Sequence, residues 1–425
     1  MLSGFLDSIK SQFGGKSYWL AAMLPLVLFL AANILVLYGH FPDLATWLPK
    51  ADGLDQKTLL YSTLTATLLA LAYVLSIMNS VMLEALEGKI GPFRWASSLL
   101  YGAQVHTLRA IDRDYQSARS LQSEIKDERP NWEDRLDRSL QVSETAPALP
   151  GYHPIIWHFT AVGRKMAYIR FSQRRGRCIN PDHLRKAVNV LTEALIRNNT
   201  IRQPLLSNAV DDLRSAITYA LDRYQFEIRR LVHLRQTNFP GVRPTAVNQP
   251  EGPSANSILL PTAMGNIGRA MSTYTLMRYQ LDLDIFWTRL QNSLQKDAKD
   301  YYAVLQDSKV QVDCAVTLFW FSLAFTLFWP PALLWWLVDS TVREFLLVSV
   351  VGSVFTVVSY SLACQSYRVF ADVMRSSVDL FRFQVLQALH LSLPYGSEEE
   401  RDLWLRLGGA TGFGNEENFQ YKHSP

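Results

Sequence analysis

Cysteine is scarce in this chain of 425 residues, which holds only Cys178, Cys314 and Cys364, an odd number without CxxC spacing. Neither a disulfide framework nor a zinc site is therefore predicted. A net charge of +4 is too small over this length to indicate a nucleic-acid-binding protein. The chain also has no HExxH, P-loop, GxSxG elbow or paired CxxC motif. We expect no enzyme, no metal and no cofactor.

Charge is absent from four long runs, which cover residues 18–38, 59–83, 314–338 and 345–367. Each run is long enough to cross a hydrocarbon layer of about 30 Å. A buried helix in a large soluble core is the alternative, but such long uncharged runs favour membrane spans. The 11 Trp, 18 Tyr and 21 Phe residues fit the aromatic belts of a membrane protein.

Basic residues flank one end of each span, whereas the short connections 39–58 and 339–344 are less basic, each with one more acidic than basic residue. The flanking residues are Lys10, Lys16, Lys89, Arg94, Lys296, Lys299, Lys309, Arg368 and Arg375. The positive-inside rule then places both termini and residues 84–313 in the cytoplasm. We expect a multi-pass protein of the bacterial inner (plasma) membrane.

The predicted fold is an all-α membrane protein with two transmembrane hairpins that bracket a helical cytoplasmic domain. Residues 1–17 form a cytoplasmic N-terminal segment, and hairpin 1 covers 18–83 with spans at about 18–38 and 59–83. The helical domain covers 84–313. Hairpin 2 covers 314–367 with spans at about 314–338 and 345–367, and the fourth span extends into a cytoplasmic amphipathic helix and tail, 368–425.

Within the helical domain, a helix is predicted over 93–126, and Pro130 is expected to end it before a loop at 127–151. The segment 153–171 is ambiguous. Further helices are predicted at 181–198, at 204–236, where apolar residues recur at helical spacing, and over 262–312. Residues 238–257 are rich in Pro, Gly, Asn and Ser and are predicted to form a loop, and GGATGFG (408–414) a flexible tail.

Small residues recur along the fourth span at the spacing that lets another helix approach closely. They are Ser349, Gly352, Ser353, Thr356, Ser359 and Ala363. Contact with the other spans of the same chain and formation of a homo-oligomer both explain this pattern.

The strongest concentration of charge is a basic run with no acid among its members, Arg164, Lys165, Arg170, Arg174, Arg175 and Arg177. Three readings remain open. The run contacts anionic lipid headgroups, it captures a phosphate-bearing ligand such as a nucleotide or RNA, or it is a solvated face paired with the acidic stretch 124–137.

Five charges of alternating sign follow the fourth span, at Arg368, Asp372, Arg375, Asp379 and Arg382. Their spacing of 4, 3, 4 and 3 puts them within an arc of roughly 80° on a helix. We expect successive members of this charged strip to pair with one another. The strip faces open cytoplasm, the helical domain, or a water-filled axis in an oligomer.

Three stretches are similar to one group of bacterial integral membrane proteins to which no activity is assigned. They are NSVMLEALEGKIGP (79–92), LPTAMGNIGRAMSTYTLMRYQLDLDIFWTRL (260–290) and VFADVMRSSVDLFRFQVLQALHLSLPYGSEEERDLWLRL (369–407). The resemblance implies a four-span membrane protein with a large cytoplasmic insertion. The chain departs from the group at Ala263, Ser272 and Gln280, where a basic residue, an acid and Gly are expected.

In the second of these stretches, four charged residues are candidates for an internal polar network: Arg269, Arg278, Asp282 and Arg289. A folding role and a ligand pocket are the two interpretations.

The expected function is that of a membrane protein whose helical domain senses or binds a ligand or a cytoplasmic protein partner. It would couple that event to an oligomeric channel or another membrane effector. The alternative is a membrane-anchored scaffold that recruits cytoplasmic partners without transport.

Overall fold

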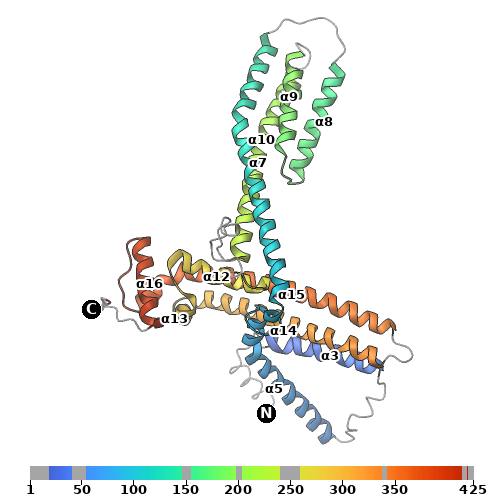
Figure 1. Cartoon of the computed structure of the whole chain (residues 1–425), viewed down its shortest axis with the longest axis vertical. Helices are drawn as coiled ribbons and strands as arrows, with labels where there is room; N and C mark the ends of the chain where they lie inside the picture. The colour runs from blue at the N-terminus through green and yellow to red at the C-terminus, as the bar shows by residue number, and fades with distance from the viewer. Residues whose placement is uncertain are drawn as a thin grey trace. The chain divides into compact units, whose positions relative to one another are not determined.

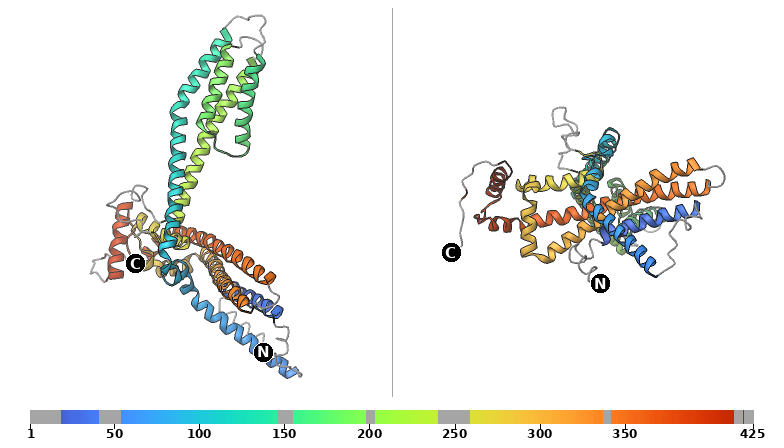
Figure 2. Two further views of the ribbon diagram at one scale, coloured as in Figure 1. Left: turned by 45° about the vertical axis from the view of Figure 1, so that its right-hand side comes forward. Right: turned by 90° about the horizontal axis from the view of Figure 1, so that it is seen from below.

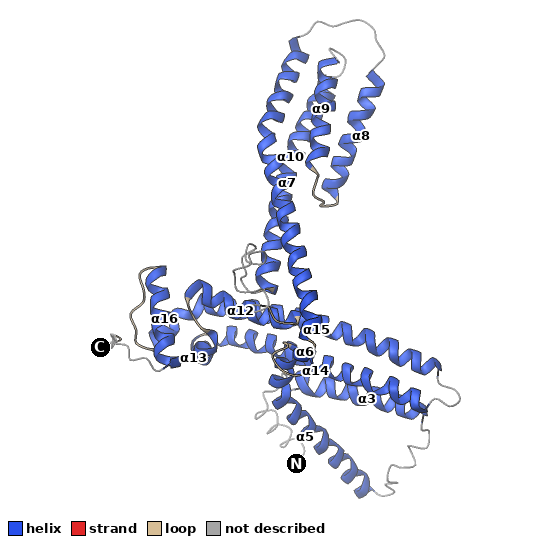
Figure 3. Cartoon of the chain, in the orientation of Figure 1, coloured by secondary structure: helices blue, strands red, loops and turns tan. Residues whose placement is uncertain are grey.

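The structure is a computed structural model that describes residues 19–40, 54–145, 155–197, 203–239, 259–336, 342–413 and 419. Every element within these ranges is a helix, and none of them is a strand (Figure 3). The predicted all-α class is confirmed. The expected N-terminal segment 1–17 and residues 240–257 of the expected loop lie outside the described residues.

The chain divides into two compact units, one formed by residues 107–235 and the other by residues 1–106 together with 236–425. Both boundaries fall inside helices, the first in α7 (Ser97–Thr145) and the second in α10 (Gln203–Asn238). Residues 84–106 and 236–313 thus belong to the unit that holds the apolar helices, although the sequence placed all of 84–313 in one domain.

The four-helix unit, residues 107–235, consists of most of α7 and α10 together with α8 (Ile155–Arg174) and α9 (Pro181–Arg197). These helices run side by side (Figures 1 and 2). All four contribute buried apolar side chains to one core, among them Ile125, Trp132, Leu136, Ile169, Leu184, Leu191, Val210, Leu213 and Ile217. The predicted helices at 181–198 and 204–236 are confirmed to within two residues.

Helix α7 passes straight through Pro130, so the predicted helix end at this residue is wrong, as is the loop over 127–145. Proline lacks the N–H that the helix needs, which normally costs about 3 kcal/mol in a helix interior. Here Ile125, Trp132 and Leu136 keep helical spacing on both sides of Pro130 and are fully buried in the same core. Burial of these large side chains offsets the lost hydrogen bond.

Three helices are long and apolar enough to cross a membrane: Tyr61–Leu86 of α5 (Leu54–Leu86), Lys299–Leu334 of α14 (Lys299–Trp336) and Phe345–Ala388 of α15 (Val342–Ala388). They contain the second and fourth predicted spans and residues 314–336 of the third, whose last two residues lie outside the described residues. The first predicted span appears as η1 (Trp19–Met23) and α3 (Leu24–His40), whose apolar stretch Ala21–Leu37 is shorter. Its passage through the membrane stays a prediction.

Two hydrogen bonds between side chains link apolar helices within the chain. Trp329 Nε1 donates to Asn33 Oδ1 at 2.8 Å, and Thr317 Oγ1 donates to Asn79 Oδ1 at 3.0 Å. A Cβ on Gly352 of α15 would lie 2.7 Å from Oγ1 of Thr326 in α14. The small residues of α15 therefore accommodate α14 of the same chain, and the predicted homo-oligomer remains untested.

The described residues of this unit form four further helices: α6 (Pro92–Trp95), α12 (Ala263–Tyr279), α13 (Leu283–Asp297) and α16 (Ser397–Phe413). The last three pack against α15, or against each other, around a core that includes Phe286 and Trp404, whose ring centroids are 5.1 Å apart. Because α16 extends to Phe413, the flexible tail predicted from residue 408 is wrong for 408–413. Gln280 ends α12 with φ 58, a conformation that Gly adopts at little cost.

Candidate functional site

The charged strip lies on the second half of α15, beyond the uncharged part of the helix. Asp372 is exposed, but the other four members are partly covered, and only 11% of the Arg375 side chain and 14% of the Arg382 side chain reach solvent. Since a single helix cannot cover its own side chains to this extent, other parts of the chain face the strip. Of the three readings, open cytoplasm explains this burial least well.

The first arginines of the strip contact the last turn of α10. Arg368 Nε donates to Asn238 Oδ1 at 2.5 Å, and Arg375 Nη2 donates to the backbone oxygen of Gln236 at 3.5 Å. Arg375 also forms an ion pair with Asp372, at 2.8 Å. The carboxyl end of a helix carries unpaired carbonyl groups and a partial negative charge, so cations are favourable there.

The middle of the strip contacts α12. Tyr279 Oη donates to Asp379 Oδ1 at 2.7 Å, and Tyr274 Oη donates to Asp379 Oδ2 at 2.9 Å. Burial, and after it the hydrogen bond to Asp379, raises the pKa of both tyrosines, which keeps the hydroxyl protons in place as donors. Arg278 Nη1 donates to Tyr274 Oη at 2.6 Å.

The end of the strip contacts α16. Arg382 Nε donates to Glu400 Oε1 at 2.6 Å, and the guanidinium lies 4.2 Å from the centre of the Tyr279 ring. Among the five described side chains of the strip, Asp372 and Arg375 form the single ion pair, while Arg382 donates to the backbone oxygen of Asp379 rather than to its carboxylate. The expected chain of successive ion pairs is therefore wrong for the other members. Spacing placed the five charges on one face, but most of their partners come from α10, α12 and α16, among which Glu400 of α16 supplies the opposite charge for Arg382.

The four residues of the predicted polar network do not bond to one another. Arg278 bonds Tyr274, Asp282 caps its own helix through the Asp284 N–H, and Arg289 donates to the backbone oxygen of Ile285. Arg269 is exposed. Only Arg278 belongs to the cluster around Asp379, where it lies over the ring of Tyr279 at 5.4 Å.

A buried carboxylate that the sequence did not single out lies where α5, α12 and α15 meet. Glu87 is 3% exposed, accepts a hydrogen bond from Tyr367 Oη, and pairs with Lys89 at 2.6 Å. A Cβ on Gly268 would lie 2.7 Å from Tyr367 Oη and 2.9 Å from Glu87 Oε1. The signal was present in the sequence, as a Glu-Gly pair after an uncharged run and two glycines three residues apart.

The basic run is distributed along and just after α8. Arg170 forms an ion pair with Asp212 of α10, and the Arg175 guanidinium lies 4.6 Å from the centre of the Phe171 ring. Arg174 and Arg177 are exposed. Arg164 and Lys165 line a pocket of about 350 Å³ together with Tyr168 and His183, whose rings are 4.6 Å apart.

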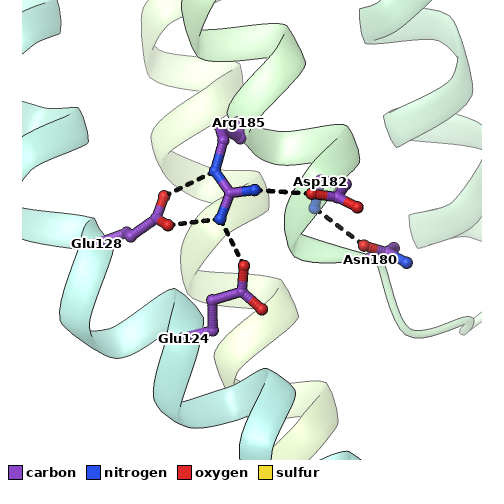
Figure 4. Close-up of polar contacts among 5 residues, drawn as sticks. All are labelled: Glu124, Glu128, Asn180, Asp182 and Arg185. Carbon is purple, nitrogen blue, oxygen red and sulfur yellow. Dashed lines mark hydrogen bonds and ion pairs between the residues drawn. The ribbon is translucent and has the colours of Figure 1, made fainter.

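The acidic stretch 124–137 pairs with α9 and α10, where its partners are Arg185 and Arg214. Arg185 contacts Glu124, Glu128 and Asp182 at once (Figure 4). Its Nε donates to Glu128 at 3.1 Å and its Nη1 to Asp182 at 2.7 Å. The six members of the basic run are not seen to pair with this stretch within the described residues, so the pocket remains the feature that could serve a ligand.

Comparison of the chain with protein-family models, with curated proteins and with solved structures gave no match. The resemblance to the group of bacterial membrane proteins stays a prediction. Within the described residues, no three His, Cys, Asp or Glu side chains are grouped so as to hold a metal ion.

Proposed function

We propose that this chain is a membrane protein in which the four-helix unit binds an anionic ligand and transmits the binding to α15. The proposal rests on the bonds of Arg368 and Arg375 of α15 to Asn238 and Gln236 in the last turn of α10. Residues 203–235 of the same helix belong to the four-helix unit, so α10 is continuous from that unit to these bonds. A shift of α10 along its axis changes these bonds, and α15 contains an apolar stretch long enough to cross a membrane. A contact with two alternative arrangements is what coupling between distant sites requires.

The ligand we propose is a phosphate-bearing anion in the pocket of Arg164, Lys165, Tyr168 and His183. Arginine and lysine bind phosphate oxygens through charge-assisted hydrogen bonds. A concave site suits a small ligand better than the surface of a bilayer, so we favour the soluble anion over lipid headgroups for this part of the chain.

Binding is tested with the full chain in phosphatidylcholine nanodiscs, titrated with inorganic tripolyphosphate. Lys165→Gln should weaken binding about tenfold, because it removes one charge-assisted contact. The matched controls are Arg174→Gln and Arg177→Gln, which remove the same charge from the same run outside the pocket. Equal losses in all three variants would mean general electrostatic attraction, and no binding by the unmodified chain would exclude this ligand class.

The effector we propose is a homo-oligomeric channel in the bacterial inner membrane, with both termini and residues 84–313 in the cytoplasm. Ion flux is measured in phosphatidylcholine proteoliposomes with and without tripolyphosphate. Arg368→Gln should retain binding at the pocket and lose the ligand-dependent part of the flux. Flux that is unaffected by ligand in every variant would contradict the coupling.

A membrane-anchored scaffold is the second candidate. It is favoured by the pairing of Asn33 with Trp329, and of Asn79 with Thr317, inside one chain, which leaves these polar groups unavailable to line a pore. A scaffold predicts no flux under any condition.

A further inference from the structure

Residues 89–95 connect α5 to α7, through α6, and expose one large aromatic side chain. Trp95 is 84% exposed, whereas Phe93, two residues earlier, packs against a buried cluster. An indole ring left in water forgoes the burial of a large apolar surface. The exposure of Trp95 next to the end of an apolar helix favours an environment that is less polar than bulk water.

The segment begins where the apolar part of α5 ends. Gly88 has φ 77, its N–H donates to Ala85 O at 3.0 Å, and the Lys89 N–H donates to Glu84 O at 3.1 Å. These two bonds and the left-handed glycine form a Schellman motif, which ends a helix and turns the chain aside. The chain thus leaves the α5 axis directly after the run Tyr61–Leu86.

Helix α6 packs next to the positions on α14 and α15 where the uncharged runs of these two helices end. The Phe93 ring centroid lies 5.9 Å from that of Trp320 in α14, and Trp320 Nε1 donates to Met82 O of α5 at 3.0 Å. The same buried cluster contains Val316 of α14 and Tyr367 of α15. Asp313 lies three residues before Val316 on α14, and Arg368 directly follows Tyr367 on α15, so the uncharged parts of these two helices, like that of α5, end close to this cluster.

We propose that residues 89–95 bind the headgroup of an anionic phospholipid. Trp95 lies in the headgroup layer with its ring toward the acyl chains, as tryptophans at membrane interfaces do. Arg94 is exposed and binds the lipid phosphate. Lys89 adds little net charge because it is paired with Glu87 at 2.6 Å.

This site is distinct from the pocket of the four-helix unit. It does not depend on the relay, by which we mean the proposed transmission of ligand binding from the four-helix unit through α10 to α15. It assigns anionic lipid to the end of α5, whereas the sequence considered lipid only for residues 164–177.

The test is a titration of the full chain in detergent with phosphatidylglycerol, with bound lipid counted by native mass spectrometry. Arg94→Gln should weaken lipid binding about fivefold, from the loss of one juxtamembrane charge. Trp95→Ala should also weaken it, while Trp95→Tyr retains most of the binding. Arg343→Gln is the matched control. Arg343 is an exposed arginine in the first turn of α15, at the other end of the uncharged run from Arg368.

Two further comparisons test whether the ligand is a lipid or a free phosphate ester, and whether it binds at residues 89–95. Glycerol 3-phosphate at equal concentration should not displace the lipid, because it lacks the acyl chains that accompany Trp95. Equal affinity in Arg94→Gln, Trp95→Ala and the unmodified chain would overturn the proposal, as would an equal loss in Arg343→Gln. If Trp95→Ala does not fold, the comparison of Arg94→Gln with Arg343→Gln decides alone.

Discussion

Two glycines of α12 allow this helix to lie close to the end of α5 and to α15, near the buried carboxylate of Glu87. A Cβ on Gly265 would collide with the backbone oxygen of Glu87, and one on Gly268 would press on Tyr367 Oη. A side-chain terminus can move aside, but the backbone at Glu87 is fixed by the end of α5. Gly265 is therefore the less tolerant of the two positions.

We expect Gly265→Ala to destabilise the chain by about 1–3 kcal/mol, the usual cost of overpacking. Thermal unfolding in detergent measures the effect. Gly102→Ala is the control, since Gly102 lies within α7 with nothing within 4 Å of an added Cβ. It should be neutral or raise stability by up to about 1 kcal/mol, as alanine favours a helix over glycine. Equal stability of the two variants would contradict the close approach of α12 to Glu87.

Asp379 should be strongly coupled to Tyr279. Asp379→Ala leaves the Tyr274 and Tyr279 hydroxyls without their acceptor, at a cost of about 2–4 kcal/mol, whereas Tyr279→Phe should cost about 1 kcal/mol. A double-mutant cycle, measured by unfolding in detergent, should give a coupling energy of about 0.5–3 kcal/mol. Asp307→Ala is the control, because Asp307 is exposed, and it should change the free energy of unfolding by less than about 0.5 kcal/mol. Additive effects of the two substitutions would place Asp379 in water.

At the scale of elements, regular apolar spacing predicted the helices well. The prediction was wrong where a helix end was inferred from a single proline. Pro130 is exposed on α7, and the buried residues around it stabilise the helix through it. Helix propensity acts within a few residues, whereas the compensating core comes from α8, α9 and α10. The tertiary packing that corrects the prediction is not visible in a local pattern.

Of the candidate site, the sequence predicted only the residues that share one face of α15, and not their partners on other helices. The spacing of Arg368 to Arg382 placed the charges on one face, but Tyr274 and Tyr279 are 105 and 100 residues from their partner Asp379. No local pattern encodes such contacts, and Glu87, 280 residues from Tyr367, was missed for the same reason. The pocket at Arg164 likewise depends on the packing of α8 against α9.

The contacts of Arg185 between α7 and α9 should make the four-helix unit sensitive to acid. The hydrogen bond from Arg185 lowers the pKa of Glu128, with burial opposing. A carboxyl whose pKa is lower in the folded state stabilises the fold above its unfolded pKa of about 4.3, and this stabilisation is lost as the pH falls through the folded pKa. We expect thermal stability, followed by helical circular dichroism, to decline below about pH 4.

Glu128→Gln should weaken this decline and lower stability at neutral pH. Glu193→Gln on α9 is the control, because Glu193 is exposed. The same acid response in Glu128→Gln as in the unmodified chain would show that Arg185 and Glu128 do not contribute to it.

At the scale of the whole molecule, the basic flanks predict the side of the membrane on which each connection lies. Reporter fusions at Gly53 and Ser340 should score external, and a fusion at Gln249 internal. The uncharged parts of α5, α14 and α15 end close to one buried cluster, so we expect their charged flanks to lie on the same side of the membrane. An external signal at Gln249 would reverse the orientation on which the relay depends.

The most direct test of the relay is hydrogen exchange of the full chain in phosphatidylcholine nanodiscs, with and without tripolyphosphate. We expect the ligand to change exchange in α8 around Arg164 and also at residues 368–382 of α15, because the last turn of α10 is bonded to Arg368 and Arg375. Lys165→Gln should abolish both changes, and Arg368→Gln should abolish only the change in α15. Ligand-dependent exchange confined to residues 107–235 in the unmodified chain would contradict the relay.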